Sequence, residues 1–502
     1  MQQPAGRILP IEKIPSLNIL IPTYADKLRF KWQFRDEFEH MVSRYPEMWL
    51  NFKERVGNHK DADKETVEQL EHIIMDKYTQ WQFSDKFKGN PQKERWYKWL
   101  IEEATTWMCY RDQYVEKTIQ GADSYYHALT LLAYTQDWEN RNEAKRWENA
   151  ERYAASKAQV ILAAQRYVET FGQDSESYHY FLRKYKSLRI VINFERAEMN
   201  KLAKAHRATF NAIPRAYDFA TCLLSWDHRN NKICVESFLP RQYKLRVSAP
   251  NKRTVQGKSM NQSNGMTFAW ANFIQVLDAN QGADAPEYLK MPLLLNDFKL
   301  KEGGSKVRYR IIGSREYIFT KEMGTVAKCH AYQEWSFGTI VLRIYSDLGV
   351  RLHYGHPDVF HAPWATAHFG LSKCSPDIHV SEDVFAGIEA KKYSEHTKHL
   401  EHMQVFKGRE TGLANMSTFD AKISLGNPGI MRSRDTYALM DRLDFIHRFL
   451  FFFGISGHFT TIAIMMFSIK WYLMTLLLLS LQGESLRAYS HMMFGSEWLI
   501  HA

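Results

Sequence analysis

The stretch NFIQVLDANQ, residues 272–281, joins a short apolar run to a polar end. A continuous apolar run bounded by turn residues is typical of a strand buried on both faces. Ligands of open α/β sheets bind outside the carboxyl ends of the strands, so Asp278, Asn280 and Gln281 are candidate nucleotide-binding residues. The alternative is a simple turn, because Asp and Asn side chains at a strand end bond their own backbone.

Similar runs elsewhere in the chain favour the same class of fold. They are Leu17–Ile21, Leu188–Asn193, Ala220–Ser225 and Arg310–Gly313. Strands separated by helical or loop stretches predict an α/β fold. Residues from about Lys27 to Glu169 instead show helical spacing, so we expect that part to be mainly helical.

Length and charge narrow the class of protein. A chain of 502 residues predicts two or three domains, and its net charge of +10 suits an acidic partner such as a nucleotide, an anionic lipid or a nucleic acid. No arginine-rich run or RNA-binding motif supports the nucleic-acid reading, so we predict none as a partner. The five cysteines form no CxxC pair, which favours a reducing compartment and gives almost no support to a structural zinc site.

The two ends of the chain differ. The first residues carry no secretory signal, whereas Phe459–Leu481 is long and apolar enough to cross a membrane despite Lys470. The aromatic stretch Phe449–Phe453 is expected to lie along the membrane interface just before it. A buried hairpin of two core helices is the alternative.

Polar loops supply candidate binding groups. The segment GKSMNQSN, residues 257–264, predicts a loop in which Lys258 meets a phosphate, although it lacks P-loop spacing. The segment RLHYGHPDVF brings together His353, Tyr354, His356 and Asp358. Its Gly and Pro favour a rigid polar loop over a metal site.

Two later motifs have the chemistry that glycosyl transfer needs. Glu382 and Asp383 are adjacent carboxylates, and Lys407 and Arg409 lie in a glycine-flanked loop. A carboxylate could take the proton of an attacking hydroxyl, and cations could stabilise a departing diphosphate. The alternatives are a solvated helix start and an ordinary surface loop.

Taken together, six motifs occur in an order that resembles one family. They are QVLDANQ, GSREYIF, LHYGHPDVF, SEDVFAG, QVFKGRETGL and SRDTY, the last of which contains Arg434. The family is the 1,3-β-glucan synthases of fungi and plants, whose plant members are called callose synthases. The resemblance implies a GT-A-like nucleotide-sugar domain at the cytosolic face of the plasma membrane, making 1,3-β-glucan from UDP-glucose for cell walls or callose.

The resemblance also implies roles for individual residues. Lys258 would contact the donor diphosphate, and Asp278, Asn280 and Gln281 would line the UDP pocket. Asp383, beside Glu382, would be the general base in a single inverting displacement, and Lys407 and Arg409 would face the leaving UDP. The remaining expected substrate-binding residues are His353, Tyr354, His356, Asp358 and Arg434. A role for Mg²⁺ stays open because no plain DxD motif is present, and a Rho-type GTPase is an expected regulator.

We therefore expect a mainly helical part over 1–186, a GT-A-like core over 187–445 and an interfacial and transmembrane region over 446–502. Family members carry further membrane helices, so the chain is expected to be a fragment or to need a partner that supplies the glucan channel. Two departures favour a second hypothesis, a catalytically silent scaffold or regulatory subunit. The usual arginine before Ser-Lys is His368, and the usual Gly-Glu-Gln reads Pro428-Gly429-Ile430.

Overall fold

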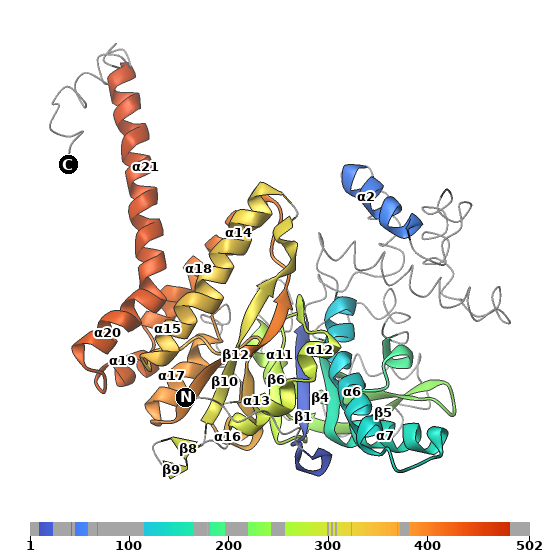
Figure 1. The fold of residues 1–502 in the computed structure, drawn as a ribbon. Coiled ribbons are helices and arrows are strands. Elements are labelled where there is room, and N and C mark those ends of the chain that lie inside the picture. The colour runs from blue at the N-terminus through green and yellow to red at the C-terminus, as the bar shows by residue number, and fades with distance from the viewer. Residues whose placement is uncertain are drawn as a thin grey trace.

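A computed structural model shows a mixed α/β architecture built on one large sheet (Figure 1). The residues that it describes are 10–23, 42, 46–58, 68, 115–164, 178, 181–195, 219–241, 257–298, 301–302, 305–306, 309–322, 324–368, 370–371 and 381–481.

Ten strands from the described residues form the large sheet, in the order β5-β4-β3-β2-β1-β6-β11-β10-β12-β7. Their bounds are β1 (Leu17–Thr23), β2 (Ala158–Ala164), β3 (Leu188–Glu195), β4 (Phe219–Asp227), β5 (Lys232–Arg241), β6 (Phe273–Val276), β7 (Gln281–Gly282), β10 (Tyr309–Ile318), β11 (Val359–His361) and β12 (His396–Lys407). A separate two-stranded sheet pairs β8 (Lys301–Glu302) with β9 (Ser305–Lys306).

The order of the central strands creates one special place in the sheet. The chain runs from β1 outward through the parallel neighbours β2 and β3, and later returns to the other side of β1 as parallel β6. Beyond β6, antiparallel β11 separates it from β10, which pairs in parallel with β12. The strand order therefore reverses between β1 and β6, and ligands of open α/β sheets bind at such a switch point.

The sheet buries apolar side chains on both faces. Along β1, Leu17, Ile19 and Ile21 belong to the core that includes helix α6 (Val115–Gln136), whereas Leu20 belongs to a second core that includes Met266. Met266 ends helix α11 (Gly257–Met266), which packs on the sheet so closely that a Cβ on Gly265 would lie 2.4 Å from Leu20 Cδ1. Strands covered on both faces explain the near-continuous apolar runs in the sequence.

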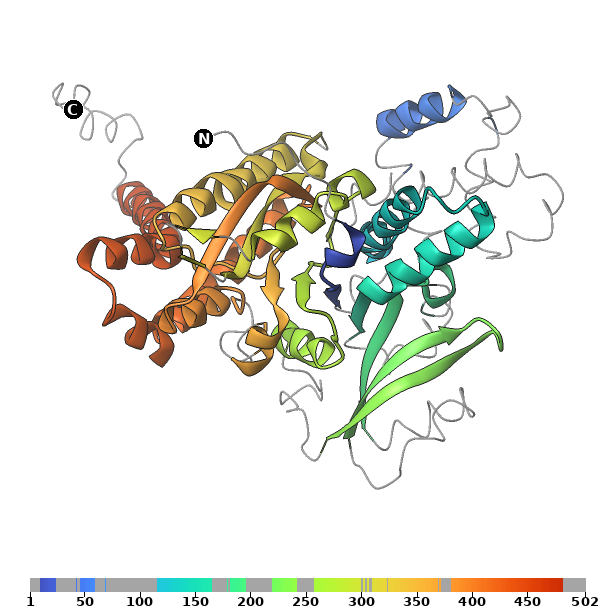
Figure 2. The same cartoon turned by 60° about the horizontal axis from the view of Figure 1, so that its bottom comes forward.

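Helices surround this sheet, and the paired helices α6 and α7 lie side by side in Figure 2. Besides α6 and α11, the α-helices are α2 (Pro46–Gly57), α7 (Glu143–Lys157), α12 (Ala285–Tyr288), α13 (Met291–Asp297), α14 (Thr325–Trp335), α15 (Leu342–Asp347), α16 (Ala362–Ala367), α17 (Val384–Lys392), α18 (Leu413–Met431), α19 (Arg434–Met440), α20 (Phe445–Phe452) and α21 (His458–Leu481). Short 3₁₀ turns cover Ile11–Lys13 and Phe319–Glu322, and π-helical segments cover Ser336–Val341 and Phe453–Gly457.

The apolar runs predicted to be strands are confirmed. The five runs correspond to β1, β3, β4, β6 and β10, all of which lie in the large sheet. Since β1 and β2 precede residue 186, the sheet extends across the division predicted there. This is the mixed α/β fold that the alternation of runs indicates.

Two local predictions are wrong. Residues 158–164, inside the region predicted to be helical, form the fully buried strand β2, because a short, largely apolar run fits a buried strand as well as a helix. Residues 257–264, predicted to be a loop, form most of helix α11. Of the region from Lys27 to Glu169, residues 27–41, 43–45, 59–67, 69–114 and 165–169 lie outside the described residues.

The C-terminal helices differ from the rest of the fold. Helix α21 extends away from the sheet in Figure 1, and its segment Thr460–Leu481 is apolar and long enough to cross a membrane. The apolar part of this helix is not buried inside the molecule, which argues against the buried-hairpin alternative. In the stretch 449–453, Phe449, Phe452 and Phe453 are exposed, whereas Phe451 is buried, so its position at a membrane interface stays a prediction.

Candidate active site

Asp278 lies two residues beyond β6, at the carboxyl end of the strand beside the switch point. A tight turn fixes its backbone, because the Asp278 N–H donates to Gln281 Oε1 at 2.8 Å and the Gln281 N–H donates to the Asp278 carbonyl at 3.0 Å. The carboxylate itself binds Lys258. Asp278 therefore takes part in a turn and in an ion pair at once. Gln281 closes the turn on the Asp278 backbone, so the Asp278 carboxylate is left to pair with Lys258.

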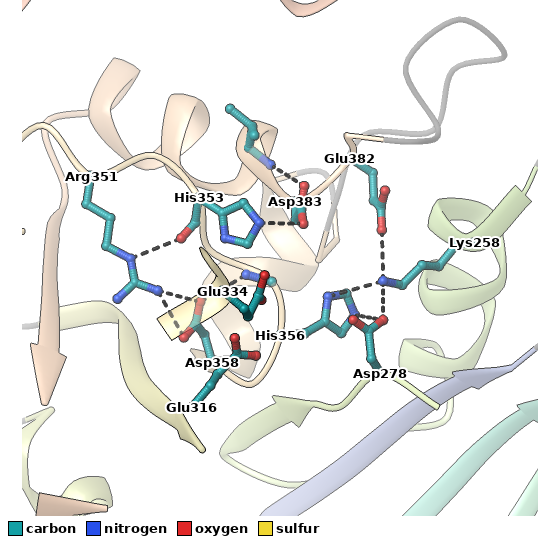
Figure 3. A network of polar contacts seen from close by, with 12 residues as sticks. Lys258, Asp278, Glu316, Glu334, Arg351, His353, His356, Asp358, Glu382 and Asp383 are labelled. Carbon is teal, nitrogen blue, oxygen red and sulfur yellow. Dashed lines mark hydrogen bonds and ion pairs between the residues drawn. The ribbon is translucent and has the colours of Figure 1, made fainter. Parts of the chain in front are cut away.

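Lys258, in the first turn of α11, is the centre of a compact cluster that we call the Lys258 cluster (Figure 3). Its ammonium contacts the Asp278 carboxylate, and it lies 3.3 Å from His356 Nδ1 and 3.4 Å from Glu382 Oε1. Four parts of the chain therefore meet at the Lys258 ammonium. They are helix α11, the turn after β6, the loop before β11 and Glu382, which precedes helix α17. Lys258, Asp278, His356 and Glu382, each predicted as a site residue, thus lie together, and their roles stay predictions.

The protonation states follow from burial and charge. Burial acts to raise the pKa of Asp278, but His356, Lys258 and Lys407 together hold this pKa well below its usual range. Burial lowers the pKa of His356 to about 3, against the pull of Asp278. The imidazole is therefore neutral near pH 7, and the lasting positive charge beside Asp278 comes from lysine.

The neutral imidazole fixes a chain of hydrogen bonds. An ammonium can only donate, so His356 Nδ1 is the acceptor from Lys258 and Nε2 carries the hydrogen. Gln262 Nε2 lies 2.8 Å from His356 Nε2, so turning the side-chain amide by 180° brings its oxygen to the position that accepts the Nε2 hydrogen. Gln262, one helical turn after Lys258, was not singled out from the sequence.

The two adjacent carboxylates have unlike environments. Glu382 is 2% exposed, and burial, together with the charge of Asp383 and against that of Lys258, raises its pKa to about 7. Asp383 caps α17 by accepting from the Val384 N–H at 3.0 Å, and its other oxygen lies 2.8 Å from His353 Nε2. Burial acts to raise the pKa of Asp383, but His353 holds it well below the usual range.

The helix-start alternative is therefore half right. Asp383 does begin a helix, yet the Glu382 side chain is only 3% exposed and that of Asp383 only 19%. Asp383 in turn raises the pKa of His353, against the effect of burial. Near neutrality this places one permanently ionised carboxylate beside one that exchanges its proton.

Lys407 and Arg409 form a second group of charges at the end of β12, and the surface-loop alternative is wrong because both side chains are buried. Lys407 Nζ lies 2.9 Å from Glu316 Oε1 and 2.8 Å from Glu334 Oε1. Arg409 also pairs with Glu334, which lies on α14. We call these four side chains the Lys407 cluster.

Backbone contacts tie the two clusters together. Strand β7, formed by Gln281 and Gly282, pairs with the end of β12. The Asn280 side chain donates to the Gly408 carbonyl at 2.9 Å, and the Gly408 N–H donates to the Asn280 carbonyl at 2.9 Å. Gln281 also donates from its side chain to Glu316. Asn280 and Gln281 therefore connect the turn after β6 to the loop that carries Lys407.

Three predicted residues lie apart from the Lys258 cluster. Asp358 is fully buried and binds Arg351 Nη2 with both oxygens, at 3.2 and 3.0 Å. Tyr354 is fully buried in the core, where its ring lies 4.2 Å from the Arg351 guanidinium carbon. Arg434 is exposed at the first position of α19. Glu316 stands in a quoted motif and Glu334 in none, and nothing in the sequence shows that either carboxylate pairs with Lys407.

The carboxylate arrangement does not suit a divalent metal. Asp278 and Glu382 both direct oxygens to the Lys258 ammonium, so a fixed cation already stands between them. Within the described ranges, no group of three or more His, Cys, Asp or Glu side chains is placed to hold an ion. His353, His356 and Asp358 also bind different partners, so they form no common site.

Comparisons with known proteins agree on one family. A family model described as 1,3-beta-glucan synthase component matches residues 1–493. Callose synthase 12 of Arabidopsis thaliana is 28% identical over 94% of this chain and 27% of its own length. Two fungal relatives are the 1,3-beta-glucan synthase components bgs1 of Schizosaccharomyces pombe, 26% identical over 92% of this chain and 27% of its own, and FKS1 of Aspergillus niger, 26% over 93% and 25%. The chain thus spans about a quarter of the length of these curated relatives.

Proposed function

The chain belongs to the family of 1,3-beta-glucan synthase components, and on that premise we propose that it is the catalytic region of a synthase that extends 1,3-β-glucan with glucose from UDP-glucose. The observation that carries this proposal is the convergence of Lys258, Asp278 and Glu382 at the switch point of the sheet. A cation and two unlike carboxylates are the groups that glycosyl transfer from a nucleotide sugar requires.

The fold supports a GT-A-like assignment. Parallel strands β3, β2, β1 and β6 end on one edge, and Asp278 follows the strand that adjoins the reversal of strand order. A nucleotide at this edge would lie against α11, with Lys258 near its diphosphate. Asp278, Asn280 and Gln281 would then line the UDP pocket, as the sequence predicts.

The proposed reaction is a single displacement with inversion. The acceptor 3-hydroxyl gives its proton to a carboxylate, its oxygen bonds to C1 of glucose, and the bond from C1 to the diphosphate oxygen breaks. The electron pair leaves with UDP, whose charge Lys258, Lys407 and Arg409 would stabilise. No step is assigned to Mg²⁺, because the carboxylates already surround a lysine.

The sequence predicts Asp383 as the general base, whereas the geometry favours Glu382. A base works best with a pKa near the operating pH, and that of Glu382 is about 7. Asp383 is held by His353 and by the helix N–H, and its charge is one cause of the raised pKa of Glu382. In this proposal Asp383 tunes the base and Glu382 takes the proton.

The silent-scaffold hypothesis has a structural observation in its favour. Ile430, where the family usually has a glutamine, is fully buried in a core cluster with Phe385 and Leu439. His368, where the family usually has arginine, stacks on Trp364 with ring centroids 5.3 Å apart. Neither side chain replaces the polar group it stands for, so these positions distinguish this chain from the family pattern.

A polymer assay separates the two hypotheses. Membranes that contain the full-length protein are supplied with UDP-glucose, and the product is digested with a 1,3-glucanase. We expect a digestible polymer that Lys258→Ala reduces by about 10²–10³-fold, while Lys186→Ala, which removes an exposed lysine paired with Glu151, leaves it unchanged. Absence of polymer from correctly inserted wild-type protein supports the scaffold.

Placement in the cell remains part of the proposal. Helix α21 would span the plasma membrane, with the exposed phenylalanines of α20 at its cytosolic interface. A glucan channel would need further helices, from the rest of a longer protein or from a partner. Regulation by a Rho-type GTPase is a prediction from the resemblance alone.

A further inference from the structure

We propose that Glu334 and Glu316 are positioning residues that hold Lys407 and Arg409 in place for the donor diphosphate, an inference that rests on the proposed function. Neither glutamate was predicted as a site residue. Glu316 lies on β10 and Glu334 near the end of α14, so each comes from a different element than the cations they bind. They would act through these cations and not on the substrate.

The geometry gives each glutamate a separate task. Lys407 Nζ is shared between Glu316 Oε1 at 2.9 Å and Glu334 Oε1 at 2.8 Å. The other oxygen of Glu334 pairs with Arg409. Glu334 therefore bridges the two cations and sets their separation, while Glu316 anchors one of them to the sheet.

Burial makes this arrangement rigid. All four side chains are under one-tenth exposed, and a buried charge that loses its partner is strongly destabilised, so the cations stay where the carboxylates are. A further contact packs Arg409 over the ring of Phe419 on α18, at 4.3 Å from the ring centroid. Lys407 and Arg409 thus reach the site with little freedom to be lost on binding.

A hydrogen-bonded path connects this cluster to the donor side. Gln281 donates from its side chain to Glu316 and accepts the Asp278 N–H through Oε1. One amide therefore touches both the carboxylate that anchors Lys407 and the backbone of the residue that binds Lys258. A shift of Glu316 would displace both sets of charges.

The pKa values of the two glutamates are shifted in opposite directions. Burial, reinforced by Glu334 and opposed by Lys407 and Arg409, raises the pKa of Glu316 to about 7. Burial acts in the same direction on Glu334, but Arg409 and Lys407 hold its pKa well below the usual range. Beyond Arg409, Glu410 Oε2 lies 3.6 Å from His330 Nδ1. Near neutrality Glu316 is therefore partly protonated, whereas Glu334 stays ionised between Lys407 and Arg409.

The test uses the full-length protein in detergent, with UDP binding, kcat and KM for UDP-glucose, and thermal melting as readouts. Glu334→Gln keeps the shape and removes the charge. We expect kcat per folded molecule to fall by about tenfold to a hundredfold, with KM changed by less than about threefold. Glu395→Gln, which breaks the 2.8 Å pair with Arg310 on the far end of β10, is the matched control and should leave kcat unchanged.

Glu316→Gln gives a second, independent readout if Glu334→Gln fails to fold. Gln imitates the protonated form of Glu316, so the ratio of wild-type to variant kcat should be largest at roughly pH 8 and should shrink toward roughly pH 6, where the wild type is protonated too. Titration of Glu382 affects both proteins equally and cancels in the ratio.

The outcomes keep the two proposals apart. If the wild type neither binds UDP nor forms polymer, the proposed function fails, and this inference fails with it. If the wild type binds UDP and forms polymer while both variants behave like Glu395→Gln, or while the ratio for Glu316→Gln is constant with pH, only the positioning role is overturned.

Discussion

The loop 351–358 contributes polar side chains to two clusters whose hydrogen bonding differs sharply. On one side, Asp358 accepts from Arg351 twice, from the Gly355 N–H at 3.0 Å and from the Ser314 N–H at 3.2 Å. On the other side, His356 joins the Lys258 cluster, in which Glu382 Oε1 has the ion pair at 3.4 Å and no hydrogen bond among the described residues. The hydrogen-bonding capacity of the Asp358 carboxylate is therefore filled, whereas Glu382 Oε1 can still accept a hydrogen bond.

The contrast shows how to separate structural from functional charges in this fold. Four hydrogen bonds from three donor nitrogens saturate the Asp358 carboxylate, so it has nothing left to offer a substrate. The Lys258 cluster contains a carboxylate that gains and loses a proton near neutrality. Substitutions on the first side should therefore cost stability, and substitutions on the second should cost activity.

The largest expected effect is that of Glu382→Gln. Losing the general base should lower kcat by about 10²–10⁴-fold in the polymer assay. Folding raises the pKa of this group from 4.5 to about 7, so wild-type stability falls as pH rises through that range and stays lower above it. Glutamine avoids this loss, so the variant should melt above the wild type at roughly pH 8. A variant that is inactive because it melts lower would contradict the assignment.

Substitution of Asp358 should have the opposite effect to that of Glu382, with a loss of stability instead of a loss of activity. Asp358→Ala leaves the Arg351 guanidinium buried without its carboxylate, which should lower the free energy of unfolding by about 3–5 kcal/mol. Chemical denaturation of purified protein measures it. Whatever protein remains folded should keep its UDP affinity, and a loss of affinity without a loss of stability would place Asp358 in the site after all.

A substitution at Gly313, on strand β10, tests the packing around Arg351 with a smaller expected loss of stability. An added Cβ at Gly313 would lie 2.0 Å from Arg351 Nη1, so Gly313→Ala should cost about 1–3 kcal/mol. Gly412, where an added Cβ would meet nothing within 4 Å, provides the matched control as Gly412→Ala. Equal melting temperatures for the two variants would mean that Arg351 can move aside.

The smallest expected effect is a shift of pH dependence. Asp383→Asn can still cap α17, but it removes a negative charge that raises the pKa of Glu382. The acid limb of kcat/KM should therefore move to lower pH, with a moderate loss of activity. A near-complete loss with an unshifted acid limb would instead support Asp383 as the base, as predicted from the sequence.

The sequence predicts the strands better than the partners. Apolar runs identify β1, β3, β4, β6 and β10 because a buried strand needs them. The run 158–164 lacks flanking turn residues, so its period is ambiguous between strand and helix.

For the candidate site, too, the sequence predicts residues better than it predicts their partners. Lys258, Asp278, His356 and Glu382 lie in motifs, and the structure brings them together. Tyr354 and Asp358 lie in a motif as well but are buried away from the cluster, since a pattern of letters does not show which side of a loop a residue faces. Glu334 is 73 residues from Lys407, and only the tertiary fold pairs them.

The position of β1 in the sheet has a consequence for synthesis of the chain. This central strand occupies residues 17–23, while its two neighbours, β2 and β6, begin at residues 158 and 273. At ordinary rates of translation, β6 follows β1 by roughly 10–50 s. During that time β1 has an unpaired apolar edge, so we expect the nascent chain to need chaperone protection until the second neighbour emerges.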